Sequence, residues 1–202
     1  MFVLSTSSTD QKDIRSVLLE IRRIAHKFSC SPEDMVFVPG RMDLKRLPTD
    51  LAPSTVNELK NIVRTNEALR KALSDWATQY EVTIDQDHIF RESQVVWLQG
   101  GSISSKNDRV AVYIALPRPK AESAILGHTM GPSDSTHELA SEGFVEREVT
   151  DGQKVGSSFK CQVGDLLILR GGEKLCVRGE SAVQSRGMCA FVSVYQTTTR
   201  KD

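Results

Sequence analysis

The sequence is poor in features that would direct it out of the cell or into a membrane. It has four cysteines, and Cys30, Cys161, Cys176 and Cys189 form no CxxC pair, so neither a disulfide scaffold nor closely spaced zinc ligands are indicated. Only four apolar residues precede Ser5, which is too few for the core of a signal peptide. No run approaches the roughly 18–20 apolar residues of a membrane-spanning helix. We therefore expect an intracellular protein, cytoplasmic or nuclear, with reduced thiols and no membrane partner.

The sequence also lacks an excess of either charge. Its 26 lysines and arginines balance 26 aspartates and glutamates, which leaves no long-range attraction for a polyanion. General nucleic-acid binding is therefore not expected. Phosphate-binding glycine loops, nucleotide fingerprints and a Gly-x-Ser-x-Gly nucleophile motif are absent from the sequence as well. The apolar fraction of 39% is nevertheless typical of a globular protein with a real core.

Amphipathic helices are predicted in the N-terminal part. Apolar residues recur at three- and four-residue spacing over residues 14–28, and Pro32 ends this helix. A second apolar stripe covers residues 56–80. Thr65 and Asn66 weaken its middle, so the stripe belongs either to one kinked helix or to two helices.

The period of the pattern changes to that of strands after residue 82. Residues 110–116 place Val and Ile on one face, and Tyr113 with two alanines on the other. Asp151-Gly152 between two apolar runs predicts a hairpin. Seven or so strands without intervening helices predict an antiparallel sandwich or barrel. Residues 117–143 form a long connection that we expect to be functional or disordered.

The segment from Gly164 to Leu175 resembles the second conserved motif of the cupin family. Gly164 and Gly172 stand at the two glycine positions of that motif, whereas Arg170 replaces its proline and Leu175 its metal-binding histidine. Over residues 90–196 the resemblance implies a double-stranded β-helix. This fold is also the core of the iron- and 2-oxoglutarate-dependent oxygenases.

The resemblance to the oxygenases implies a metal held by two histidines and one carboxylate. No histidine here is followed two residues later by an acid, and none comes after His137. No metal or other cofactor is therefore predicted. The alternative is a site built from His128, His137 and Glu142, which would hold iron or another divalent metal together with 2-oxoglutarate.

The predicted fold class is α+β, with N-terminal helices followed by an antiparallel β-sandwich or barrel of the cupin-like, double-stranded β-helix type. Residues 1–84 are expected to form a helical region that packs on the β part. Residues 85–197 form the β domain, and residues 198–202 form a frayed tail.

The function favoured by the sequence is a non-catalytic binding or assembly module. A divergent metal-dependent oxygenase or other cupin enzyme is the alternative, and a structural jelly-roll subunit is the second alternative. The predicted ligand-binding residues are Tyr113, Cys176 and Arg186, of which Arg186 stands where an oxygenase keeps a basic residue for 2-oxoglutarate. The ligand is expected to enter near residues 117–143. The partner is an unknown small molecule or protein, and homo-oligomerisation is left open.

Overall fold

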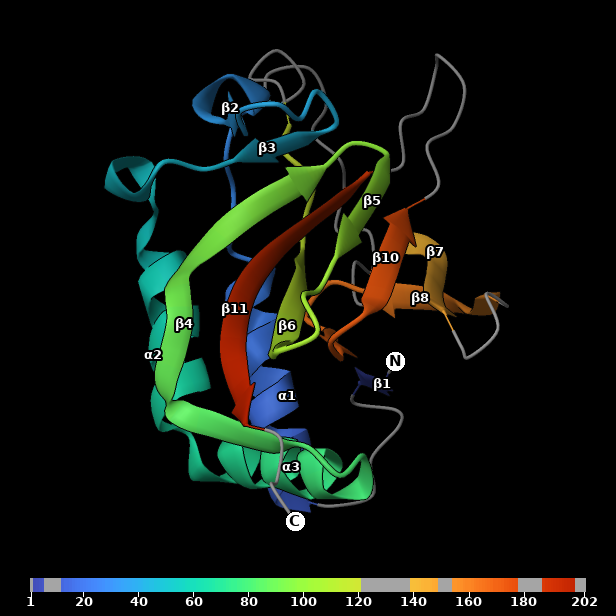
Figure 1. Ribbon diagram of the computed structural model, residues 1–202. Helices are drawn as coiled ribbons and strands as arrows, with labels where there is room; N and C mark the ends of the chain where they lie inside the picture. Colours follow the sequence, from blue (N-terminus) through green and yellow to red (C-terminus); the bar gives the residue numbers. More distant parts are fainter. Residues whose placement is uncertain (1, 6–11, 121–138, 149–153, 178–186, 199–202) are drawn as a thin grey trace.

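The chain folds into three α-helices and two β-sheets, counted over the residues that the structure describes (Figure 1). The computed structural model describes residues 2–5, 12–120, 139–148, 154–177 and 187–198. The helices are α1 (Lys12–Ala25), α2 (Ser54–Thr65) and α3 (Glu67–Gln79), with the short 3-10 helices η1 (Pro32–Asp34) and η2 (Thr49–Leu51). The strands are β1 (Phe2–Leu4), β2 (Val36–Phe37), β3 (Leu44–Arg46), β4 (Thr83–Leu98), β5 (Gly101–Ser104), β6 (Arg109–Leu116), β7 (Leu139–Glu148), β8 (Lys154–Gln162), β9 (Leu166–Leu169), β10 (Glu173–Val177) and β11 (Met188–Thr198).

The strand order identifies the fold as a double-stranded β-helix. The larger sheet has the order β1-β9-β6-β11-β4-β3-β2, and the smaller sheet has the order β5-β10-β7-β8. From β4 to β11 the chain alternates between the two sheets, except at β7 and β8, which are neighbours in the smaller sheet. An antiparallel sandwich of eight strands wound in this way is a jelly roll. The predicted α+β fold with a cupin-like β-helix is therefore confirmed.

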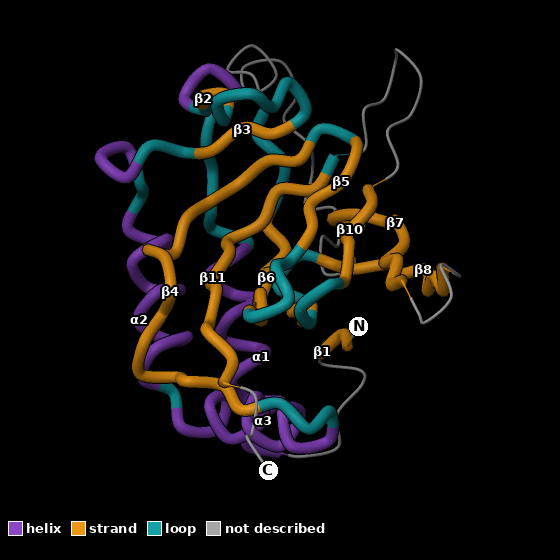
Figure 2. The backbone as a smooth tube through the Cα atoms, in the orientation of Figure 1, coloured by secondary structure: helices purple, strands orange, loops and turns teal. Residues whose placement is uncertain are grey.

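The helices cover one face of the larger sheet. Helix α2 packs on β4 and β11, α3 packs on β4, and α1 packs on β6 and on the other two helices (Figure 2). The smaller sheet contacts the larger one through β7, which packs on β6 and β11, and through β10, which contacts β9. The side chains predicted to form the buried helix faces are indeed buried: Ile14, Leu18, Ile21, Val63, Leu69, Leu73 and Trp76. In the described part of the chain, no helix is both long enough and apolar enough to cross a membrane.

The second apolar stripe is divided into two helices at Asn66. This residue adopts an extended conformation, with φ −76° and ψ 113°, and so interrupts the helix. Its side-chain oxygen accepts a hydrogen bond of 3.1 Å from the backbone N–H of Leu69, which caps the start of α3. Of the two predicted possibilities, two separate helices is therefore the one that the protein adopts.

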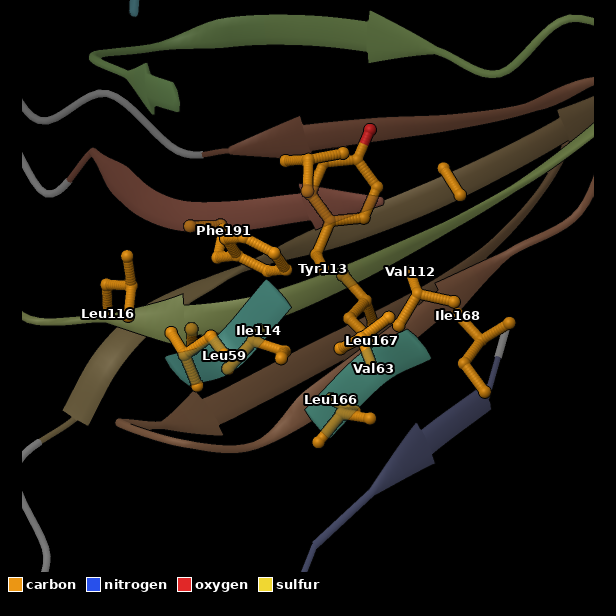
Figure 3. Close-up of a cluster of buried hydrophobic side chains, with 14 of the residues drawn as sticks. Leu59, Val63, Val112, Tyr113, Ile114, Leu116, Leu166, Leu167, Ile168 and Phe191 are labelled. Carbon is orange, nitrogen blue, oxygen red and sulfur yellow. The ribbon is translucent and has the colours of Figure 1, made fainter. Parts of the chain in front are cut away.

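Successive side chains of strand β6 point alternately to the helix-covered face of the larger sheet and to its inner face. Ile114 lies beside Leu59 of α2, whereas the ring of Tyr113 points away from that helix (Figure 3). Tyr113 lies opposite Leu167 of β9 on one side and opposite Val192 of β11 on the other. These three residues therefore share the inner face of the sheet. The alternation predicted for residues 110–116 thus gives the sheet one side for the helical core and one side turned toward the smaller sheet.

Three short strands of the N-terminal half also join the larger sheet. β1 pairs with β9 at one edge, while β3 pairs with β4 and β2 with β3 at the other edge. None of them exceeds three residues, so none is long enough to display a strand period in the sequence. The division of the chain into residues 1–84 and 85–197 stays a prediction.

A partly buried polar contact helps to fix helix α1 to the β part. Arg22 donates hydrogen bonds to the side chains of Gln162 (3.0 Å) and Asp165 (3.2 Å). Asp165 also accepts a hydrogen bond of 2.8 Å from the backbone N–H of Gln162. The helix backbone lies so close that a Cβ on Gly164 would be 2.5 Å from the Cα of Arg22. Because Gly164 also has a φ of +88°, this turn of the Gly-Asp motif requires glycine.

Candidate ligand-binding site

A cavity of about 260 Å³ lies on the inner face of the larger sheet, against β5 of the smaller sheet. Its walls come from β3, β4, β5, β6 and β11 and from the loop between β5 and β6. The lining residues are Leu44, Gln94, Val96, Ile103, Ser104, Ser105, Lys106, Arg109, Ala111, Tyr113, Val192 and Val194. Apart from Gln94, Arg109 and Tyr113, the larger sheet contributes apolar residues to the lining, whereas the β5–β6 loop contributes polar ones.

Alternate residues of β6 form one wall of this cavity. Arg109, Ala111 and Tyr113 are two positions apart, so their side chains leave the strand on the same face. Val194 and Val192 of β11 lie opposite Ala111 and Tyr113, respectively. The short side chain of Ala111 leaves room between the larger residues on either side of it.

The polar end of the cavity is a tight loop held by its own backbone and by β10 and β11. The N–H of Ser105 donates to the carbonyl of Glu173 (3.0 Å), and the hydroxyl of Ser105 donates to the carbonyl of Arg109 (3.2 Å). The N–H of Thr197 donates to the carbonyl of Asp108 (2.9 Å). These contacts fix the loop that carries Lys106 into the lining.

The glycine-rich turn before β10 supports this loop from behind. The N–H of Gly172 donates to the carbonyl of Ser105 (3.1 Å), and Gly172 has a φ of +78°. A Cβ on Gly171 would collide with the carbonyl group of Asn107, whose carbon would be 2.5 Å away. The part of the sequence that resembles a cupin motif therefore positions the polar end of the cavity.

Arg170 fixes the same turn to the helical layer. Its guanidinium donates from both Nε and Nη2 to one oxygen of Glu173, at 3.3 Å each, while its backbone N–H donates to the other oxygen (2.9 Å). The guanidinium also lies 4.3 Å from the ring centre of Tyr80, at the end of α3. Glu173 is only 2% exposed, so this pairing compensates a buried charge. Where the cupin motif has a proline, this chain thus has an arginine that stabilises the turn.

The lining carries positive charge and no negative charge among its described residues. Lys106 is exposed, and the side chain of Arg109 is 14% exposed. Asp108 lies outside the lining and forms an ion pair of 3.6 Å with Arg109, and its own side chain is 56% exposed. Burial raises the pKa of Tyr113 well above its usual range, so its hydroxyl stays protonated and can donate a hydrogen bond. The site therefore offers cations and hydrogen-bond donors beside an apolar wall.

This lining does not fit the iron that the resemblance implies. Its described donors are hydroxyls, an amide and two cationic groups, whereas such metals take imidazole, carboxylate or thiolate ligands. Elsewhere in the described ranges, too, no group of three or more His, Cys, Asp or Glu side chains is placed to hold a metal ion. His128 and His137 lie outside the described residues, and for Glu142 only the backbone, within β7, is described. The alternative metal site stays a prediction.

The three predicted ligand-binding residues have different locations. Tyr113 lines the cavity. Cys176 is buried in β10, paired with Ser102 of β5, and is not among the described lining residues. Arg186 lies outside the described residues. Sequence reasoning did not single out Arg109, because the predicted strand begins one residue later, at residue 110. In the structure β6 begins at Arg109, and its spacing of four from Tyr113 places both residues on one face.

A second hollow, of about 460 Å³, runs along the outer side of α2. Its described lining consists entirely of polar or charged residues: Asn57, Lys60, Asn61, Arg64, Thr65 and Gln86. It has no apolar wall, and four of these six residues are exposed. The cavity between the sheets is the better ligand site because it combines apolar surface with a few polar groups.

No family model matches the chain, and no curated protein matches it in sequence. Solved structures resemble it in fold at low identity. The non-heme alpha ketoglutarate dependent epimerase SnoN from nogalamycin biosynthesis is 9% identical over 98% of this chain and 80% of its own, with a TM-score of 0.46. A Pseudomonas putida prolyl-4-hydroxylase is 10% identical over 96% and 91%, with a TM-score of 0.43. The Fe(II)/(alpha)ketoglutarate-dependent dioxygenase TqaL is 10% identical over 97% and 81%, with a TM-score of 0.38.

Proposed function

We propose that this protein is a non-catalytic binding module that holds a small molecule in the cavity between its two sheets. The observation that carries the proposal is the lining of that cavity. It joins an apolar wall, formed by residues such as Val96 and Val192, to a polar end formed by the β5–β6 loop. Ligand sites typically combine an apolar surface with a small number of placed polar groups.

The chemical character of the lining supports binding rather than catalysis. Its described side chains include no imidazole, carboxylate or thiol that could act as a general base or nucleophile near neutral pH. Tyr113 is held in its neutral form by burial, and so serves as a hydrogen-bond donor. These groups can orient a ligand and exclude water from it.

The size of the cavity limits the ligand. A volume of about 260 Å³ lies just below the range of roughly 300–1,000 Å³ that is typical of sites for drug-sized molecules. We therefore expect a ligand of small-metabolite size. The β5–β6 loop, held at Ser105 by two hydrogen bonds to β10 and its turn, gives it a preformed polar contact surface.

The proposal is tested by titrating isotope-labelled protein with three pairs of small probes, followed by NMR. The pairs are benzoate and benzamide, phenylacetate and phenylacetamide, and hexanoate and hexanamide. At least one probe should cause saturable shifts of the backbone amides of Ala111 and Val192. Ala111→Phe should abolish them by filling the cavity, whereas Val155→Phe, at a position that is 58% exposed on β8, should leave them unchanged. If no probe bound, or if Ala111→Phe left binding intact in a folded protein, the proposal would be wrong.

A further inference from the structure

We infer that the ligand is a small organic anion with an apolar body, whose carboxylate is held at the β5–β6 loop by Lys106 and Arg109. This inference rests on the proposed function, because it names the class of ligand for the same cavity. It follows from the distribution of charge and apolar surface around the cavity. Neither of the two cationic residues stands at the position of Arg186, the basic residue that the oxygenase resemblance implies.

The polar end of the cavity is built to receive negative charge. Lys106 and Arg109 are three residues apart on the loop and at the start of β6, and both line the cavity. Ser104, which also lines it, adds a hydroxyl group at the same end. A guanidinium with an ammonium and a hydroxyl donor beside it matches the acceptor-only chemistry of a carboxylate.

The hydrogen bonds of the loop keep the backbone that carries these cations in place without a ligand. The N–H of Arg109 donates to the carbonyl of Lys106 (3.1 Å), which closes a turn between them. Because the backbone on both sides is tied to β10 and β11, little order has to be gained when an anion binds. Arg109 forms an ion pair of 3.6 Å with Asp108, whose side chain is exposed. Because an exposed ion pair contributes little free energy, the carboxylate of a ligand can replace that of Asp108.

The rest of the lining requires the anion to carry an apolar body. Beyond Arg109, β6 presents Ala111, and β11 presents Val192 and Val194, to the same cavity. A small inorganic anion would leave this apolar wall in contact with water. A carboxylate on a short aliphatic or aromatic group would cover the wall and gain from its burial. Gln94 and Tyr113 remain as polar contacts for a further substituent on that body.

The matched probe pairs separate this inference from the proposed function. Benzoate and benzamide have nearly the same shape and differ in charge, so their affinity ratio reports the contribution of the anion. We expect the carboxylate of each binding pair to bind about tenfold more tightly than its amide in low-salt buffer, which is the order of a charge-assisted hydrogen bond. The ratio should fall as salt is added.

Substitution of the two cations identifies the site of the effect. Arg109→Met and Lys106→Met should each reduce the ratio toward one by weakening carboxylate binding, with amide binding retained. Lys106 is exposed, so Lys106→Met keeps the test valid even if Arg109→Met fails to fold. Asp108→Asn should raise carboxylate affinity, because it removes a carboxylate that competes for Arg109.

Two results would overturn the inference. Equal affinity for carboxylates and amides, with both lost in Ala111→Phe, would refute the anion while leaving the binding module intact. A carboxylate preference that survives both Arg109→Met and Lys106→Met would place the anion elsewhere. Failure of every probe to bind would refute the proposed function itself.

Discussion

The ion pair between Arg22 and Asp165 is a partly buried polar contact between α1 and the β-sandwich. The side chain of Asp165 is 6% exposed and that of Arg22 is 17% exposed. Removing the arginine would leave a buried acceptor with part of its compensation gone. A fully buried pair broken in this way costs roughly 3–5 kcal/mol, and the partial exposure of Arg22 reduces the expected cost to about 2 kcal/mol.

We predict that Arg22→Ala lowers the free energy of unfolding by about that amount, measured by urea denaturation. The double variant Arg22→Ala/Asp165→Asn should lose less than the sum of the two single variants, by about 1 kcal/mol or more. Additive losses would show that the two side chains do not interact energetically, and would contradict the structure at this point.

The protonation of Asp165 gives a prediction about pH. Burial raises its pKa above the usual value of 3.8, although the backbone N–H of Gln162 and the charge of Arg22 oppose this shift. The folded state then holds the proton more tightly than the unfolded state. The contribution of Asp165 to stability is therefore largest below pH 3.8, and declines as the pH rises through the higher folded pKa.

The comparison that isolates this effect is between the natural protein and Asp165→Asn, whose amide does not titrate. The difference in unfolding free energy, natural protein minus variant, should fall as the pH rises from about 3.8, and level off above the folded pKa. A difference that rises over this range would mean that the ion pair with Arg22 outweighs burial.

Gly171 has no Cβ, and this allows the backbone of Asn107 in the β5–β6 loop to pack against it at the polar end of the cavity. We predict that Gly171→Ala lowers stability by about 1–3 kcal/mol, because its Cβ meets the carbonyl group of Asn107 and the loop must shift. Since this loop carries Lys106, carboxylate binding should weaken as well. Gly156→Ala is the matched control, because its Cβ would have no neighbour closer than 3.8 Å. Equal tolerance of both changes would argue against the close packing of turn and loop.

Helices α2 and α3 meet at Asn66, which ends the first helix and begins the second. Asn66 caps α3 through the N–H of Leu69, and a lost cap of this kind costs about 1 kcal/mol. Asn66→Ala should therefore lower the thermal unfolding midpoint. Asn61→Ala, in the exposed middle of α2, should be neutral or slightly stabilising because alanine is the better helix former. A neutral Asn66→Ala would indicate that the two helices are fixed by packing alone.

The sequence predicts elements of this protein where the pattern is long. The apolar faces of α1, α2 and α3 and the alternation of residues 110–116 in β6 are periodic over seven residues or more, and the structure has these elements. Strands β1, β2, β3 and β5 have four residues or fewer and exist because the neighbouring strands provide hydrogen-bond partners. No local sequence pattern predicts these strands, because they are stabilised by pairing with other strands that are distant in the sequence.

The cavity was predictable only in part, for a similar reason. Tyr113 belongs to a long alternating strand, so its face could be inferred from the sequence. Lys106 and Arg109 enter the site because the turn at Gly171 and Gly172 folds the β5–β6 loop into place. That contact joins residues more than 60 positions apart, and the sequence shows it only as a glycine-rich turn.

At the scale of the whole molecule, the two faces of the larger sheet have separate roles. The outer face is covered by the helices, with Leu59 and Val63 of α2 packed beside Ile114 and its neighbours (Figure 3). The inner face meets the smaller sheet and retains a cavity beside Tyr113. The helices thus stabilise the sheet from one side, and the other side remains available for a ligand.

The central claim is that the ligand occupies this inner cavity, and its most direct test is the position of a heavy-atom probe. A crystal of the protein grown with 4-bromobenzoate should show one anomalous bromine peak beside Ala111 and Val192, with the carboxylate directed toward Arg109. A peak only in the hollow along α2, or ordered probe with its carboxylate away from the β5–β6 loop, would contradict the account.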